Sequence, residues 1–300
     1  MKDQAHTLRR IFEGGASSSF PQVLSVTSGK GGVGKTSIVV NMAIILAQKG
    51  KKVLVLDADL GLANVDVMLG LMPKHNIQHV LDGQCALEDI LLEGPEGIKI
   101  IPASSGIQEL SDLTNEQQLC LVNSLDYFDQ HIDYMIIDTG AGISRNVMYF
   151  NTAAQRILVV CTPEPTSITD AYALIKVLRK QYGIKRFDLI VNNASSKIEG
   201  DQVARQLTLV CERFLGDVAL EILGSIPTDK TISECIKGQK AFVGVHPTGE
   251  ASIRLERVVN RLEQTSRNSN SGNLQFFLKR MLLNQSKGSS HAGYSISRSY

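Results

Sequence analysis

The sequence predicts a doubly wound α/β fold, in which a mostly parallel sheet carries helices on both faces. Strand-like and helix-like segments alternate along most of the chain, which is the order that builds parallel βαβ units. The strand-like segments are continuous apolar runs, as expected for parallel strands that are buried on both faces. A glycine-rich turn joins the first of these runs to a helix-like segment. The expected strands lie at residues 23–26, 53–59, 98–102, 134–138, 156–161, 187–193 and 220–227.

The composition is that of a globular protein with a sizeable core, since 43% of the 300 residues are hydrophobic and 20% are charged. A net charge of +1 argues against a nucleic-acid surface spread over the whole molecule. No apolar run approaches the roughly 20 residues of a membrane-spanning helix, and the N-terminus lacks the apolar core of a secretory signal. The five cysteines have no metal-ligand spacing and are expected to be buried thiols in a reducing compartment. We therefore expect a cytoplasmic protein.

The loop Ser28–Thr36, with the sequence SGKGGVGKT, separates the first apolar run from a helix-like segment over 38–46. Strand, glycine turn, Lys-Thr and helix together are the sequence context of a phosphate-binding P-loop. In such a loop, backbone N–H groups and the positive end of a helix converge on phosphate oxygens. Lys35 would reach the outer phosphates, and the Thr36 hydroxyl would ligate Mg²⁺. Unlike an ordinary P-loop, this loop has a second lysine, Lys30. Its glycines would let the backbone curl around the anion: Gly29, Gly31, Gly32 and Gly34.

Carboxylates follow two of the expected strands. Asp57 and Asp59 end the second apolar run, at the edge where open α/β sheets bind ligands. We favour a nucleotide role for at least one of them; the alternative is that both cap the following helix. Asp138 ends the strand that begins at Tyr134 and precedes a turn that contains glycine. An aspartate there would hold Mg²⁺ through water, and a glycine N–H would sense the γ-phosphate.

Asn192 ends a further expected strand, where its amide could read the edge of a purine base. The alternative, which the residues alone leave equally open, is an asparagine favoured at a strand-end turn.

The chain is expected to divide into five segments. Residues 1–19 would form a partner-binding segment with a Gly/Ser linker, although a disordered terminus is the alternative. Residues 20–263 would form the α/β domain and 264–273 a polar linker. Residues 274–284 place apolar side chains at i, i+3 and i+4 beside two basic residues, as in a membrane-surface helix; packing on the domain or on a partner is the alternative. The tail over 285–300 is polar and is expected to be disordered.

Three motifs resemble those of the ParA/MinD family of deviant Walker A ATPases. Lys30–Thr36, KGGVGKT, matches the deviant Walker A motif. Asp57–Asp59 and Asp138–Gly142 match the two switch regions at the expected separations. Switch II has Thr-Gly-Ala-Gly where a Pro-containing form is commoner, which leaves the aspartate and the first glycine intact. The resemblance covers roughly residues 20–262 and implies a MinD-like P-loop NTPase fold with ATP and Mg²⁺ as cofactors.

The resemblance also implies roles for individual residues. Lys30 would reach across an ATP-sandwiched dimer to the phosphates of the partner, which makes hydrolysis depend on dimerisation. Asp59 would orient the attacking water, so Lys30 and Asp59 are the expected catalytic residues, and Asp57 would help to maintain the site. Thr36 and Asp138 are the expected Mg²⁺ ligands. Glu164 would lie at the dimer interface, and Asn192 with the Pro227–Asp229 turn would contact adenine. The expected nucleotide-binding set is Gly29, Lys30, Gly31, Gly32, Val33, Gly34, Lys35, Thr36, Ser37, Asp57, Gly140, Glu164, Asn192, Pro227 and Asp229.

Within this family, Asp3–Arg9 resembles the N-terminal DQAxxLR segment of the FlhG subgroup, also called FleN, whose members regulate flagellar number. The helix-like segment over 274–283 resembles the membrane-targeting helix of FlhG and MinD. These two resemblances imply the GTPase FlhF as a partner through Asp3–Arg9 and an anionic membrane as a partner of 274–283. Flagellar switch or transcription-activator proteins are further expected partners, and sequence-specific nucleic acid is not.

The sequence thus predicts a Mg²⁺-dependent ATPase switch that is a dimer on the inner face of the membrane with ATP and a monomer in the cytosol with ADP. One short helix is expected to bind the membrane too weakly to hold a monomer there, whereas the two helices of a dimer bind more tightly by avidity. The rival functions are a MinD-type division-site regulator and a nucleotide-gated antagonist of a flagellar transcription activator. A ParA-type DNA partitioner is disfavoured because the net charge is near zero and no basic stripe is present.

Overall fold

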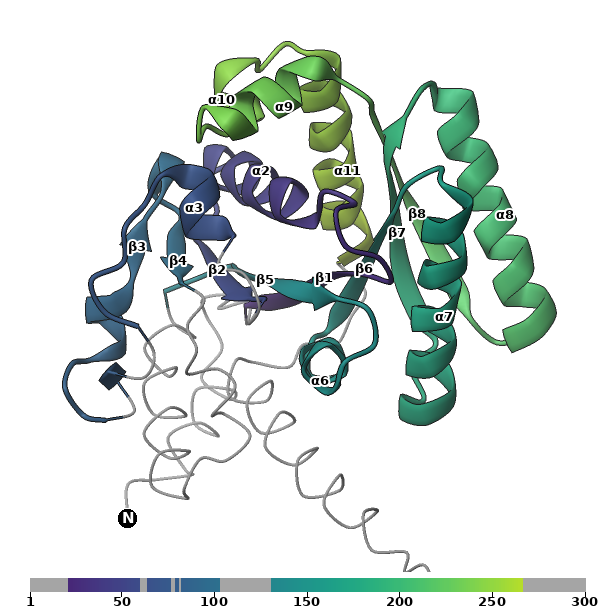
Figure 1. Cartoon of the computed structure of the whole chain (residues 1–300), viewed down its shortest axis with the longest axis horizontal. Coiled ribbons are helices and arrows are strands. Elements are labelled where there is room, and N and C mark those ends of the chain that lie inside the picture. Colours follow the sequence, from purple (N-terminus) through teal and green to yellow (C-terminus); the bar gives the residue numbers. More distant parts are fainter. Residues whose placement is uncertain (1–20, 60–63, 77–78, 81, 103–130, 267–300) are drawn as a thin grey trace, which may run out of the picture.

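The computed structural model of the chain describes residues 21–59, 64–76, 79–80, 82–102 and 131–266. At its centre is an eight-stranded sheet with the order β3-β4-β2-β5-β1-β6-β7-β8 (Figure 1). All neighbouring pairs are parallel except β3–β4, which is antiparallel. This confirms the predicted fold class. The strands are β1 (Gln22–Ser28), β2 (Val53–Ala58), β3 (Leu92–Glu93), β4 (Lys99–Ile101), β5 (Tyr134–Ala141), β6 (Arg156–Cys161), β7 (Arg186–Ala194) and β8 (Ala219–Pro227).

Helices cover both faces of the sheet. α2, α10 and α11 pack on one face in a single hydrophobic cluster, whereas α6, α7 and α8 contribute to clusters on the other face. The helices are α2 (Lys35–Gln48), α3 (Val65–Leu69), α6 (Arg145–Ala153), α7 (Pro165–Tyr182), α8 (Lys197–Leu215), α9 (Lys230–Lys237), α10 (Phe242–Val245) and α11 (Glu250–Ser266), with 3₁₀ turns η1 (Leu87–Ile90) and η2 (Pro95–Gly97).

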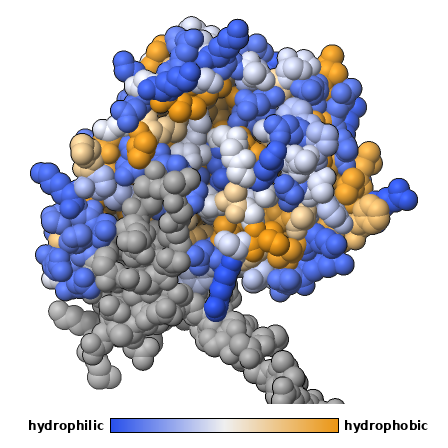
Figure 2. Space-filling view, viewed as in Figure 1, coloured by the Kyte–Doolittle hydropathy of each residue, from blue (hydrophilic) through white to orange (hydrophobic). Residues whose placement is uncertain are grey.

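Burial along the strands follows their place in the sheet. Every residue of β2 is buried, as expected for an inner strand with helices on both faces. The last strand, β8, is only partly covered and exposes its first and third residues. On the face shown in Figure 2, hydrophilic residues predominate and hydrophobic ones form scattered patches. The sheet therefore has an accessible edge at β8.

The last described helix, α11, runs from Glu250 to Ser266 and so continues past residue 263, the expected end of the α/β domain. Glu164 occupies the N-cap of α7 and a proline follows it, as is common at a first helical position. The hydroxyl of Ser167 accepts the Thr162 N–H at 3.0 Å.

Several expectations fall on residues outside the described ranges. These are the N-terminal segment 1–19, most of the linker 264–273, the helix 274–284 and the tail 285–300. Among the residues that are described, no helix combines the length and apolarity that a bilayer crossing requires. Cys161, Cys211 and Cys235 are buried free thiols, and Cys85 is free and partly exposed.

Candidate functional site

The glycine-rich loop leaves the carboxyl end of β1, an inner strand of the sheet, and enters α2 at Lys35 (Figure 1). Gly34 occupies the N-cap of α2 with φ of 88°, in the left-handed region that favours glycine. A Cβ at this position would also lie 2.4 Å from Nδ2 of Asn192. The turn into α2 therefore depends on glycine for both its backbone conformation and its packing.

The other loop glycines have different reasons to be glycine. A Cβ on Gly29 would lie 2.1 Å from the backbone C and O of Asp170 in α7, so this residue lets α7 pack against the loop. At Gly31 and Gly32 an added Cβ would meet nothing within 4 Å. The sequence predicts one role for all the loop glycines, which is to let the backbone approach an anion closely. In the structure, only Gly31 and Gly32 among these glycines have the open space that this role needs.

Thr36 and Asp138 meet at the start of α2. The Thr36 hydroxyl donates to Oδ2 of Asp138 at 2.6 Å, although the two residues are 102 positions apart. The other carboxylate oxygen, Oδ1, is one of four buried side-chain atoms without a hydrogen-bond partner in the described residues, and Oγ of Ser37 is another. A hydroxyl and a carboxylate with a free oxygen fit Mg²⁺, which is usually bound by one or two carboxylates together with phosphate oxygens and water.

The local charges also favour a cation at this place. β2 and β5 are in register, which places Asp57 opposite Asp138. The pKa of Asp138 is raised to about 7, mainly by burial and also by the carboxylates of Asp57 and Asp59, against the hydrogen bond from Thr36 and the charge of Lys35. Burial also raises the pKa of Asp57 to about 6. The buried carboxylate of Asp138 thus lies near two other carboxylates and one buried lysine, and a bound cation would stabilise its ionised form.

Asp138→Asn is expected to stabilise the nucleotide-free protein at alkaline pH. Because folding raises the pKa of Asp138 from 3.8 to about 7, the stability that this group contributes is fully present below about pH 4 and is lost as the pH rises through 7. The advantage of the variant in free energy of unfolding should therefore be larger at about pH 8 than at about pH 5. Urea titrations of both proteins at the two pH values measure this difference, and an advantage that does not change with pH contradicts it.

Asp57 organises the segment that leads into α3. Its carboxylate accepts backbone N–H groups from Asn64 at 2.9 Å, Val65 at 3.0 Å and Asp59 at 3.2 Å. Asp57 thus binds backbone at the start of α3, although the N-cap residue of that helix is Asn64. A direct nucleotide contact of Asp57 stays a prediction. Asp59 lies against the second acidic segment, because a Cβ on Gly140 would be 3.4 Å from its Oδ1. Asp59 and Gly140 therefore lie side by side, and Asp138 contacts Thr36 at the start of α2.

Lys30 points to the start of α7. Its ammonium contacts Oε2 of Glu164 at 2.5 Å and Oγ1 of Thr166 at 3.0 Å. The lysine and glutamate side chains are 38% and 63% exposed, so the pair lies at the surface and contributes little to stability. The sequence predicts that both Lys30 and Glu164 serve the nucleotide of a partner; it does not identify Thr166, and only the fold brings these residues together.

The expected adenine-contacting residues lie at the same edge of the sheet as the loop. Asn192 is buried, and its Nδ2 donates to the carbonyl of Val33 at 2.8 Å. Pro227 pairs with Ala194 across β7 and β8. The carboxylate of Asp229 caps α9 and accepts the N–H of the residue two positions later at 2.9 Å. Their contacts with a base stay a prediction.

Asn151 is a supporting residue that sequence reasoning missed. It lies fully buried in α6, accepts from the hydroxyl of Ser25 at 2.8 Å and donates to that of Thr27 at 3.1 Å. Both partners belong to β1, directly before the loop. Asn151 thus fixes the strand from which the loop starts, and nothing in its local sequence indicates this.

Comparison with known proteins finds relatives that match most of the chain. A family model described as an AAA domain, AAA_31, matches residues 21–190. The antiactivator FleN of Pseudomonas aeruginosa is 44% identical over 269 residues, which are 89% of this chain and 96% of that protein. The flagellum site-determining protein YlxH of Helicobacter pylori is 34% identical over 86% of this chain and 89% of its own. The solved structure of the MinD cell division protein of Aquifex aeolicus has a TM-score of 0.63 at 28% identity and covers 84% of this chain and 99% of its own.

Proposed function

The chain belongs to the AAA_31 family of ParA/MinD-type P-loop NTPases, and from this we propose that it is a Mg²⁺-dependent ATPase switch that regulates flagella. With ATP it forms a homodimer, in which Lys30 of each subunit serves the phosphates bound by the other. Hydrolysis returns it to the monomer. The position of Lys30 carries the proposal, because its exposed ammonium is held by Glu164 and Thr166 at the surface.

The groups within one subunit suit the binding of a triphosphate. Lys35 is 8% exposed at the positive end of α2, where it would hold the outer phosphates. Thr36 and Asp138 would hold Mg²⁺, which when bound neutralises phosphate charge and fixes phosphate geometry. Asp59 would orient the attacking water, and the adjacent Gly140 N–H would contact the γ-phosphate. The positive charge of Lys30 would then complete the site of the partner subunit.

Dimerisation is the first test. Asp59→Ala should bind ATP, slow its turnover and accumulate as a dimer with ATP, because the phosphate-binding groups remain. With ADP it should stay a monomer. Light scattering coupled to size exclusion measures both states; the same mass with ATP and ADP contradicts the switch.

We also propose that dimerisation drives membrane binding through residues 274–284, which lie outside the described residues. A single short helix binds lipid weakly, and a dimer presents two. A chain that lacks 274–300 should lose ATP-dependent binding to liposomes and keep its nucleotide affinity. Sedimentation with liposomes of phosphatidylglycerol measures this binding. If the truncated chain binds lipid as the full chain does, the membrane-binding segment lies outside residues 274–300.

The proposed client is flagellar. The higher identity to FleN than to MinD supports this choice, and so does Asp3–Arg9, through which we propose that the chain contacts FlhF. A pull-down of FlhF with and without residues 1–13 tests this contact, and equal capture contradicts it.

A second candidate is the nucleotide-gated antagonist of a flagellar transcription activator. It is supported by the 44% identity to a protein named an antiactivator. Turnover that stays slow with every partner and lipid added favours this function over a hydrolysis-driven cycle.

A further inference from the structure

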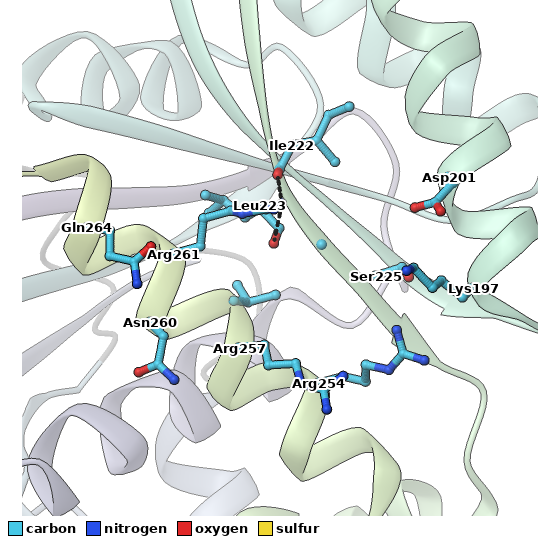
Figure 3. Close-up of a pocket in the computed structure, with 12 residues that line it drawn as sticks. Lys197, Asp201, Ile222, Leu223, Ser225, Arg254, Arg257, Asn260, Arg261 and Gln264 are labelled. Carbon is cyan, nitrogen blue, oxygen red and sulfur yellow. Dashed lines mark hydrogen bonds between the residues drawn. The ribbon is translucent and has the colours of Figure 1, made fainter.

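A groove runs along the accessible edge of the sheet, between α8, β8 and α11. Its volume is about 450 Å³, within the size range of ligand sites. Figure 3 shows Arg254, Arg257 and Arg261 along α11, with Lys197 and Asp201 on α8 across the strand. None of the residues assigned above to phosphate, Mg²⁺ or adenine lines this groove. It is therefore separate from the proposed nucleotide site.

The groove is basic because charges on α11 are segregated. This helix carries three arginines and three glutamates. All three arginines line the groove, and none of the glutamates does. With Lys197, the lining has four cations against one carboxylate, Asp201, a net charge of +3 from these five groups. Such an arrangement favours an anionic occupant.

Two of these cations have no partner within the described residues of the chain. Neither Lys197 nor Arg257 makes a hydrogen bond or ion pair there, whereas Arg254 has an exposed ion pair with Glu250 at 3.2 Å. Arg261 is used differently: its Nη1 donates to the carbonyl of Ile222 in β8 at 2.6 Å. Because this contact occupies an edge carbonyl, the groove is suited to recognition by side-chain charge rather than to addition of a further strand.

We propose that this groove binds an extended acidic segment of a partner protein, with Arg254, Arg257 and Lys197 as its carboxylate-binding residues. The chain's own C-terminal residues do not suit it, since 267–300 contain five Lys or Arg and no Asp or Glu. A flat membrane surface does not fit a concave groove. The three glutamates on the rest of α11 disfavour the longer phosphate track of a nucleic acid.

The test uses the full chain and a fluorescein-labelled peptide of alternating glutamate and serine, followed by fluorescence anisotropy at physiological salt. The double variant Arg254→Gln/Arg257→Gln should weaken binding by about tenfold or more, because it removes two charge-assisted contacts. The matched control is Arg205→Gln/Arg213→Gln, which removes two arginines of α8 that do not line the groove. It should bind the peptide as the wild type does, and both variants should keep the basal ATP turnover.

Three results would overturn the proposal. One is the absence of saturable peptide binding by the wild type. Another is an equal loss in the groove variant and in the control. The third is a groove variant that keeps its affinity for the peptide but loses affinity for a DNA duplex or for phosphatidylglycerol vesicles, which would assign the groove to phosphate. Thermal unfolding of each variant confirms that it is folded.

Discussion

Lys30→Ala is expected to lower ATP turnover by about a thousandfold, as when a charge supplied in trans is removed from a phosphoryl-transfer site. ATP affinity should change far less, because Lys35, Thr36 and the loop backbone remain. Steady-state phosphate release measures the turnover, and equilibrium binding of a fluorescent ATP analogue measures the affinity. Turnover at the wild-type rate contradicts the role of Lys30.

Two further variants distinguish the loss of turnover in Lys30→Ala from general damage to the site. Lys35→Ala should lose ATP binding itself, since its side chain is buried at the start of α2. Glu164→Gln removes the surface partner of Lys30 and should leave the midpoint of thermal unfolding unchanged, because exposed ion pairs contribute little. A large loss of stability in Glu164→Gln would show that the pair is structural.

Gly29→Ala is expected to destabilise the protein by about 3 kcal/mol or more, because the new Cβ would overlap backbone atoms of α7 that cannot move alone. Gly31→Ala is the matched control: it changes the same loop by the same methyl group, which enters open space. Its stability should stay near that of the wild type. Urea unfolding of the nucleotide-free proteins measures both, and equal stability of the two variants contradicts the packing role of Gly29.

Most of the site could be predicted because its signals are local. The turn between β1 and α2 is recognisable from glycine spacing, and Asp57 and Asp138 each follow an apolar run, although β5 continues past Asp138 to Ala141. Parallel strands bring their carboxyl ends to one edge, so these residues had to converge once the fold was known. The register of β2 and β5 bears this out by pairing Asp57 with Asp138.

The contacts that could not be predicted join residues far apart in the chain. Thr166 meets Lys30 across 136 positions, and Asn151 meets Ser25 across 126. Neither threonine nor asparagine has a local pattern that indicates such a partner. The separate role of Gly29 was missed for the same reason, because it depends on where α7 packs.

Only the structure distinguishes the two roles that the sequence allows for Asp57, a contact with the nucleotide or a contact with the next helix. A carboxylate at a strand end can face a ligand or cap the next helix, and the sequence is the same in both cases. Here its oxygens accept three backbone N–H groups, so it holds the segment that carries Asp59. Asp57 is best described as a positioning residue for the site.

Mixing two inactive variants tests most directly whether Lys30 acts across a dimer. Lys30→Ala and Asp59→Ala should each be inactive alone. In a mixed dimer, the Lys30→Ala subunit keeps Asp59 and receives Lys30 from its partner, which completes one site. An equimolar mixture should therefore recover about a quarter of the wild-type turnover, since half of the dimers are mixed and half of their sites are complete. A mixture as inactive as its components would contradict action in trans and show that Lys30 serves its own subunit.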